Sequence, residues 1–196
     1  MAVELRKGQR VNLEKNGASS GEILINLNWS QPVKKGLFSR RPQPIDLDLG
    51  CLFELMDGSK GAVQALGNSF GSLTQRPYIA LDGDDRTGTS AAGENLRING
   101  SMIPQIKRIL VYTFIYEGVA NWQEAQGIVT VKNPGSQDII VRMDEYGSSQ
   151  KMCAIAYFEN NNGVLSVEKV VRFFDGHAVM DRAFNWGLKW VPGRKD

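Results

Sequence analysis

Two aspartates separated by one residue, Asp46 and Asp48, have the type and spacing to bind a metal ion. They alternate with Ile45, Leu47 and Leu49, which is the period-two pattern of a strand with one covered face. Both carboxylates should therefore project from the same face at the beginning of the strand, roughly 6–7 Å apart at their Cβ atoms. Like charges this close repel unless water solvates them or a cation bridges them, and hard cations prefer oxygen ligands. The pair predicts either a metal site or a solvent-facing polar stripe.

A denser acidic cluster follows in the segment from Leu81 to Gly88, where Asp82, Asp84 and Asp85 fall within four residues beside two glycines. Glycine permits positive φ angles, so such a loop can wrap a cation with its own carbonyl oxygens while the carboxylates neutralise the charge. The spacing does not fit an EF-hand, because the acids do not alternate and no glutamate closes the loop. The alternative is an Asp-Gly hairpin turn whose acids are neutralised by Arg86.

Catalytic arrangements receive little support from the rest of the sequence. The only histidine, His177, follows Asp175-Gly176 at the expected start of a helix, where a structural role is favoured over a catalytic one. Cys51 and Cys153 lie inside alternating segments without a basic neighbour and match no zinc, redox or disulfide spacing. We expect two buried, reduced thiols and no enzymatic activity; a metal-dependent hydrolase is a remote alternative.

Short alternating segments separated by turn residues must position these groups. They predict an all-β fold, an antiparallel β-sandwich with one C-terminal helix at about 177–188 and long loops, in a single domain spanning 1–196. Nine strands are expected, at 3–5, 11–13, 23–29, 45–55, 109–117, 127–132, 139–143, 152–159 and 164–174.

Composition restricts the classes of function. The 196 residues are 42% hydrophobic, and 23 basic against 21 acidic side chains give a net charge of +2. This balance argues against generic nucleic-acid binding, and no apolar run approaches the roughly 20 residues of a membrane span. The N-terminal residues lack the pattern of a secretory signal, so we expect a cytoplasmic protein.

Charge is unevenly distributed along the chain. Residues 1–45 contain 8 basic and 3 acidic groups, whereas residues 46–100 contain 4 and 8. Four of the basic residues, Lys34, Lys35, Arg40 and Arg41, lie in an expected long loop at 30–44 that has no periodicity. This loop predicts either a solvated charged segment or a patch that binds an anionic membrane surface or a protein partner.

The two acidic motifs give the sequence a family resemblance. Asp46-Leu47-Asp48, followed about 35 residues later by Gly83-Asp84-Asp85-Arg86-Thr87-Gly88, resembles the TerD family of bacterial tellurium-resistance and stress proteins. The opening Leu5-Arg6-Lys7-Gly8-Gln9-Arg10 and the segment Leu27-Asn28-Trp29 are similar to that family as well. The resemblance covers roughly residues 1–165, while the ending is more similar to the TerA branch.

This resemblance implies a cytoplasmic β-sandwich that binds calcium without catalysis and acts with other proteins of a tellurium-resistance or stress complex, with a membrane-associated partner as a further possibility. The implied calcium-binding residues are Asp46, Asp48, Gly83, Asp84, Asp85 and Gly88, with Asn68 matching less closely. The chain departs from the family after Gly88, where a string of acids is replaced by a segment that retains only Glu94. Fewer carboxylates imply weaker binding and one good site rather than two.

Overall fold

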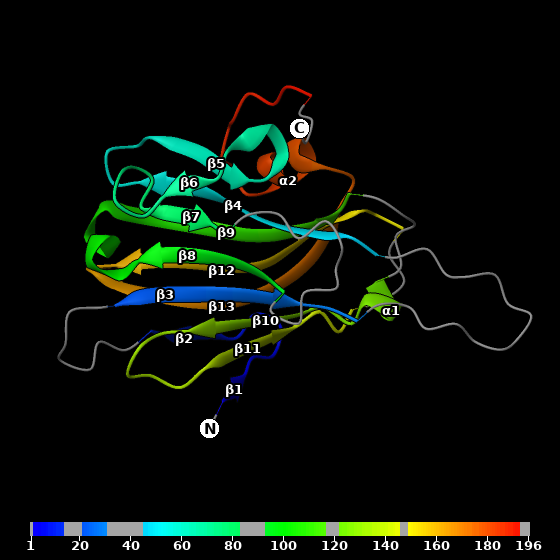
Figure 1. The fold of residues 1–196 in the computed structure, drawn as a ribbon, viewed down its shortest axis with the longest axis horizontal. Helices are drawn as coiled ribbons and strands as arrows, with labels where there is room; N and C mark the ends of the chain where they lie inside the picture. Colours follow the sequence, from blue (N-terminus) through cyan, green and yellow to red (C-terminus); the bar gives the residue numbers. More distant parts are fainter. Residues whose placement is uncertain are drawn as a thin grey trace, which may run out of the picture.

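Two β-sheets pack face to face in the computed structural model, which describes residues 2–13, 21–30, 45–82, 93–116, 122–145 and 149–192 (Figure 1). The seven-stranded sheet has the order β1 (Val3–Glu4), β11 (Ile139–Arg142), β10 (Ile128–Lys132), β3 (Glu22–Asn28), β8 (Glu94–Asn99), β7 (Ile79–Leu81), β6 (Gly71–Ser72). The six-stranded sheet has the order β2 (Arg10–Asn12), β13 (Val164–Phe174), β12 (Met152–Asn161), β9 (Ile106–Ile115), β4 (Leu47–Leu55), β5 (Lys60–Gln64).

Short helical segments connect or follow the strands. They are the helices α1 (Trp122–Ala125) and α2 (His177–Ala183) and the 3₁₀ turns η1 (Leu66–Asn68) and η2 (Gly100–Gln105). Strand pairs within the described residues are antiparallel except for β1 with β11. The predicted antiparallel sandwich is therefore confirmed, and each of the nine predicted strands is present within a few residues of its expected bounds.

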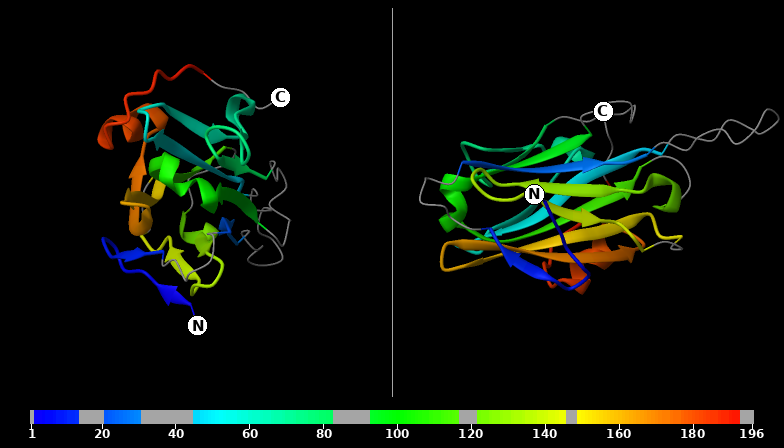
Figure 2. Two further views of the ribbon diagram at one scale, coloured as in Figure 1. Left: turned by 90° about the vertical axis from the view of Figure 1, so that its left-hand side faces the viewer. Right: turned by 90° about the horizontal axis from the view of Figure 1, so that it is seen from below.

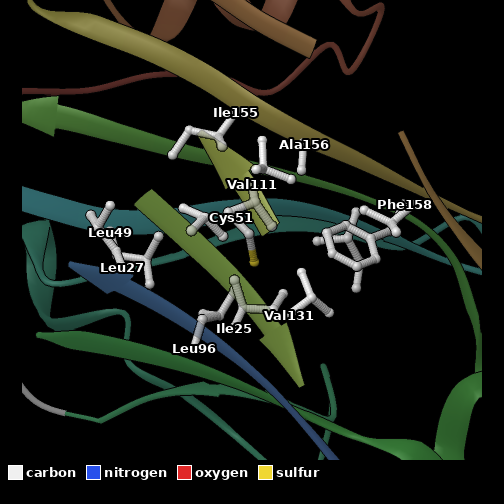
Figure 3. Close-up of a cluster of buried hydrophobic side chains, with 14 of the residues drawn as sticks. Ile25, Leu27, Leu49, Cys51, Leu96, Val111, Val131, Ile155, Ala156 and Phe158 are labelled. Carbon is white, nitrogen blue, oxygen red and sulfur yellow. The ribbon is translucent and has the colours of Figure 1, made fainter. Parts of the chain in front are cut away.

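Aliphatic side chains from both sheets fill the space between them. Figure 3 shows Ile25 and Leu96 of the seven-stranded sheet pointing toward Cys51 and Val111 of the six-stranded sheet. All four are fully buried, as period-two alternation requires for residues that face the partner sheet. At roughly 25 cal/mol per Å² of apolar surface removed from water, this core is the main stabilising contribution to the sandwich.

A second apolar cluster lies on the outer face of the six-stranded sheet. The outward-facing Leu110, Tyr112 and Phe114 of β9 pack there with Met180 of α2 and with Trp186. Residues 175–190, which we call the C-terminal segment, cover this face. Figure 2 shows α2 and the N-terminus at opposite edges of the sandwich. None of the helices among the described residues is long and apolar enough to cross a membrane.

The C-terminal helix is shorter than predicted, because it ends at Ala183 rather than near residue 188. Asn185 and Gly187 adopt left-handed backbone angles, with φ of +54° and +78°. The buried Asp181 carboxylate accepts hydrogen bonds from the backbone N–H groups of Gly187 (2.8 Å) and Leu188 (3.0 Å). These bonds favour a turn over further helix.

Candidate functional site

One end of the sandwich, drawn on the right in Figure 1, brings together the residues that flank both acidic motifs. There β4 begins in one sheet and β8 begins in the other. The Glu94 carboxylate accepts a hydrogen bond from the backbone N–H of Leu49 at 2.5 Å and so joins the two sheets. This contact lies beyond the last β4–β5 pair, Gly50 with Gln64, where β4 still pairs with β9 on one side but has no strand on its other side among the described residues.

Asp48 is buried at this end, with 1% of its surface exposed. It alternates with the core-facing Leu47 and Leu49, so its side chain lies on the outer face of the six-stranded sheet, directly opposite Phe114 of β9. The expectation of a solvent-facing stripe is therefore wrong for Asp48. Asp46 lies one residue before β4 and is half-buried, and its carbonyl oxygen accepts the N–H of Tyr116 at 3.3 Å.

Aromatic rings form the wall beside Asp48. Tyr112 pairs with Gly50, and a Cβ atom at Gly50 would lie 2.8 Å from the Tyr112 ring, so only glycine allows this ring to lie across β4. The Tyr112 hydroxyl donates to Oε1 of Gln64 at 2.6 Å. Burial, with smaller contributions from the charges of Cys51 and Asp48, raises the pKa of Tyr112 well above its usual value.

His177 packs against this wall as the first residue of α2, which confirms its predicted position at the helix start. Its ring centroid lies 5.4 Å from Tyr112, 5.1 Å from Phe114 and 4.8 Å from Trp190. Burial lowers the pKa of His177 to about 4, so the imidazole is neutral at pH 7. It packs as an aromatic ring and activates no nucleophile among the described residues.

Glu94 is 3% exposed and occupies the first position of β8, facing the sandwich interior like Leu96 and Ile98. Gly93 fixes the approach of the chain to this position. It has φ of +65°, and a Cβ atom there would lie 2.1 Å from the carbonyl oxygen of Leu27. The backbone at Gly93, just before β8, therefore lies in close contact with the end of β3.

Asp82 begins the acidic cluster at the same end of the sandwich. Its backbone N–H donates to the carbonyl oxygen of Asn95 at 2.9 Å, and its carboxylate accepts from Nε of Arg97 at 2.6 and 2.7 Å. Hydrogen bonds from Arg97 to Asp82 and Glu22 raise the pKa of the guanidinium. Asp82 therefore forms an ion pair with Arg97. The hairpin alternative predicted that Arg86 would neutralise the acids of this cluster.

The remaining predicted residues are Asn68, four residues of the acidic loop and four of the basic loop. Asn68 is the last residue of η1, which follows the end of β5, and it is exposed, with φ of +54°. Gly83, Asp84, Asp85 and Gly88 lie outside the described residues, as do the basic residues Lys34, Lys35, Arg40 and Arg41. Within the described ranges, no three His, Cys, Asp or Glu side chains converge on one point. The described carboxylates therefore do not by themselves form a metal-binding cluster.

Both cysteines are free and buried, as predicted. Burial raises the pKa of Cys51 to about 12 and raises that of Cys153 as well, which keeps both thiols protonated and unreactive at neutral pH. The aromatic group around His177 was not predicted. The sequence does contain a signal for such a group. The β9 segment is apolar on both faces, which indicates that other side chains cover its outer face.

Comparisons with known proteins agree with the fold and with the family resemblance. A family model described as the TerD domain matches residues 1–157. The chain is 45% identical over 183 residues to "Tellurium resistance protein TerA" of an Alcaligenes species, covering 91% of this chain and 54% of that protein. It is 30% identical over 141 residues to "Tellurium resistance protein TerX" of Serratia marcescens, covering 60% and 64%.

A solved structure shares the fold. It is that of a homologue of telluride resistance protein (TerD) from Streptomyces coelicolor A3(2), with a TM-score of 0.54 and 19% identity over 83% of this chain and 95% of that one. The chain spans just over half the length of the TerA relative and less than two thirds of TerX.

Proposed function

The chain belongs to the TerD domain family, and from that membership we propose that it is a non-catalytic calcium-binding module of a tellurium-resistance and stress-response system. In this proposal a calcium ion joins the two acidic motifs and orders the loop between β7 and β8. The ordered loop then forms a surface for other proteins of the same system.

One observation carries the proposal. Asp48 and Glu94, from different sheets, are both buried at the end of the sandwich where the acidic loop leaves β7 and rejoins β8. The hydrogen bond between Glu94 and Leu49 holds this end of the two sheets together. Keeping a carboxylate away from water is unfavourable unless hydrogen bonds and positive charge accompany it, and a divalent cation supplies such charge.

The donor set fits calcium rather than a softer metal. Asp46, Asp48 and Glu94 offer carboxylate oxygens, and neither the histidine nor the two thiols belong to this group. Calcium takes six to eight oxygen ligands in flexible geometry, including backbone carbonyls and carboxylates. In the structure Asp48 lies on the outer face of the six-stranded sheet and Glu94 faces the interior, so these carboxylates do not converge on one point. We propose that the ion draws Asp46, Asp48 and Glu94 together with Asp84 and Asp85 from the loop, and that the exposed Asn68 contributes weakly or not at all.

Calorimetry on the metal-free chain of 196 residues tests the proposal. Calcium should bind and should raise the melting temperature. At calcium a hundredfold above its Kd, the free energy of unfolding should increase by about 2.7 kcal/mol. The absence of binding at millimolar calcium would contradict the proposal.

Two variants test the ligand assignment. Asp48→Asn removes one buried charge with little change of shape and should weaken calcium binding at least tenfold. Asp57→Asn removes a charge from the turn at the opposite end of β4, roughly 30 Å away, and should leave the affinity unchanged. Equal loss in both variants would show that net charge, and not this site, determines binding.

A further inference from the structure

The C-terminal segment contacts the six-stranded sheet at two separate places, and one of them adjoins Asp48. The segment lies beyond the part of the chain that the family model matches. It follows β13 directly and crosses the outer face of the sheet, burying the second apolar cluster.

The first contact is the packing of His177. Its ring lies against Phe114 and Tyr112, and these are the two aromatic residues beside Asp48. Phe114 is directly opposite Asp48 in the strand pair, and Tyr112 lies over Gly50. His177 therefore supports the rings that separate this side of Asp48 from water.

The second contact is a set of directed hydrogen bonds at the far end of the segment. The guanidinium of Arg108 donates to the carbonyl oxygens of Phe184 and Asn185, each at 3.0 Å. Lys60 donates to the carbonyl oxygen of Trp186 at 3.0 Å, and the Arg108 guanidinium lies 3.9 Å from the centroid of the Trp186 ring. These bonds hold the segment at the end of the sheet away from Asp48.

Asp181 links the two contacts. Besides the turn after α2, its buried carboxylate accepts the indole N–H of Trp190 at 3.2 Å, and the Trp190 ring packs on His177. Displacement of either contact therefore disturbs the other.

We propose that docking of the C-terminal segment and ion binding at Asp48 are coupled, so that the segment is a calcium-dependent clasp over the outer face of the six-stranded sheet. This inference rests on the proposed calcium site. A cation bound at Asp48 fixes the position of its carboxylate beside Phe114 and Tyr112, which favours the docked segment. Without the cation the carboxylate and the two rings have more freedom to move, which favours release of His177.

Release of the clasp would uncover the apolar side chains of the second cluster. Calcium would then control the exposure of an apolar surface as well as the order of the acidic loop. Because coupling is reciprocal, weakening the clasp must also weaken calcium binding by the same factor.

Hydrogen exchange measured by mass spectrometry on the unaltered chain tests the coupling without any substitution. Saturating calcium should slow exchange of the amides of Val179, Met180 and Phe184, whose N–H groups bond within α2. Exchange in β10 and β11, at the other edge of the sandwich, provides the internal control. Unchanged exchange in α2 with calcium bound would overturn the clasp while leaving the calcium site standing.

Matched substitutions test the reverse direction by calorimetry. His177→Ala should weaken calcium binding about fivefold or more, as coupling between sites commonly does. Val179→Ala alters an exposed position of the same helix, and the affinity should stay unchanged. Equal affinity in all three chains would overturn the coupling, and failure of the unaltered chain to bind calcium would overturn both proposals.

Discussion

The Glu94 carboxylate, at the first position of β8, accepts the backbone N–H of Leu49 in β4 at 2.5 Å and so connects the two sheets. Sandwich sheets are held mainly by apolar packing, and a buried carboxylate between them is an exception that needs compensation. The bond provides part of it. Glu94 therefore has a structural role in the sandwich and, in the proposed calcium site, an ionic role as well.

Glu94→Gln should separate these roles. The glutamine amide oxygen can still accept the Leu49 N–H, so the melting temperature of the metal-free chain should change little. The increase in melting temperature caused by calcium should fall strongly, because one buried charge is lost. Glu168→Gln, on the exposed pair with Arg10, should retain the full increase. A Glu94→Gln chain that responds fully to calcium would exclude Glu94 as a ligand.

Gly93→Ala should destabilise the chain far more than an alanine at another positive-φ glycine. Both Gly93 and Gly58 have left-handed φ, but a Cβ at Gly93 meets the carbonyl oxygen of Leu27 at 2.1 Å, whereas nothing lies within 4 Å at Gly58. Gly58→Ala should cost about 1 kcal/mol from backbone strain alone. Gly93→Ala should cost about 3 kcal/mol, since the end of β3 must move as well. Urea unfolding measures both values, and equal losses would contradict the close approach.

His177 should make stability depend on pH in a defined window. Its pKa in the folded chain is about 4, below the value near 6.5 of an unfolded chain. Between these values the unfolded state binds a proton that the folded state does not, so the free energy of unfolding falls as the pH decreases from 6.5 to 4. The loss should be on the order of 3 kcal/mol and should vanish above pH 6.5.

His177→Phe keeps a ring in the same place and removes the titrating group. The variant should lose less stability than the unaltered chain between pH 6.5 and 4, measured by urea unfolding at each pH. Parallel stability curves for the two chains would show that His177 is not buried as described.

Local sequence predicted nine of the strands that the structure describes but missed four, β5, β6, β7 and β8. Lys60–Gln64 buries one aliphatic side chain, Val63, and Ile79–Leu81 is only three residues long, so neither has the alternation that identifies β12 or β13. Both form because the adjacent strands, β4 for Lys60–Gln64 and β8 for Ile79–Leu81, supply hydrogen-bond partners. The residues of these two segments do not by themselves predict that pairing.

The surroundings of Asp48 could not be predicted for a related reason. Alternation correctly placed Asp48 on the face opposite the core, but the cover on that face includes Phe114 and His177, which lie far along the chain. The end of α2 is a similar case. Its apolar stripe continues to Leu188, which does pack on the sheet, but the Asp181 carboxylate turns the chain before it arrives.

Arg108 provides the last prediction, because it holds the C-terminal segment through geometry as well as charge. Burial raises the pKa of Glu54, yet hydrogen bonds from Lys107 and Arg108 outweigh this effect and keep that pKa below its usual value. The same guanidinium donates through its other two nitrogens to Phe184 and Asn185. A lysine retains the charge but cannot direct three donors along fixed directions.

Arg108→Lys should therefore destabilise the chain by about 2 kcal/mol, while Arg182→Lys, at an exposed position of α2, should have no measurable effect. Urea unfolding gives the free energies, and hydrogen exchange shows where the loss occurs. Exchange should accelerate in 184–190 and not in β10. A uniform acceleration over both regions would mean that Arg108 supports the sheet as a whole and not the segment that crosses it.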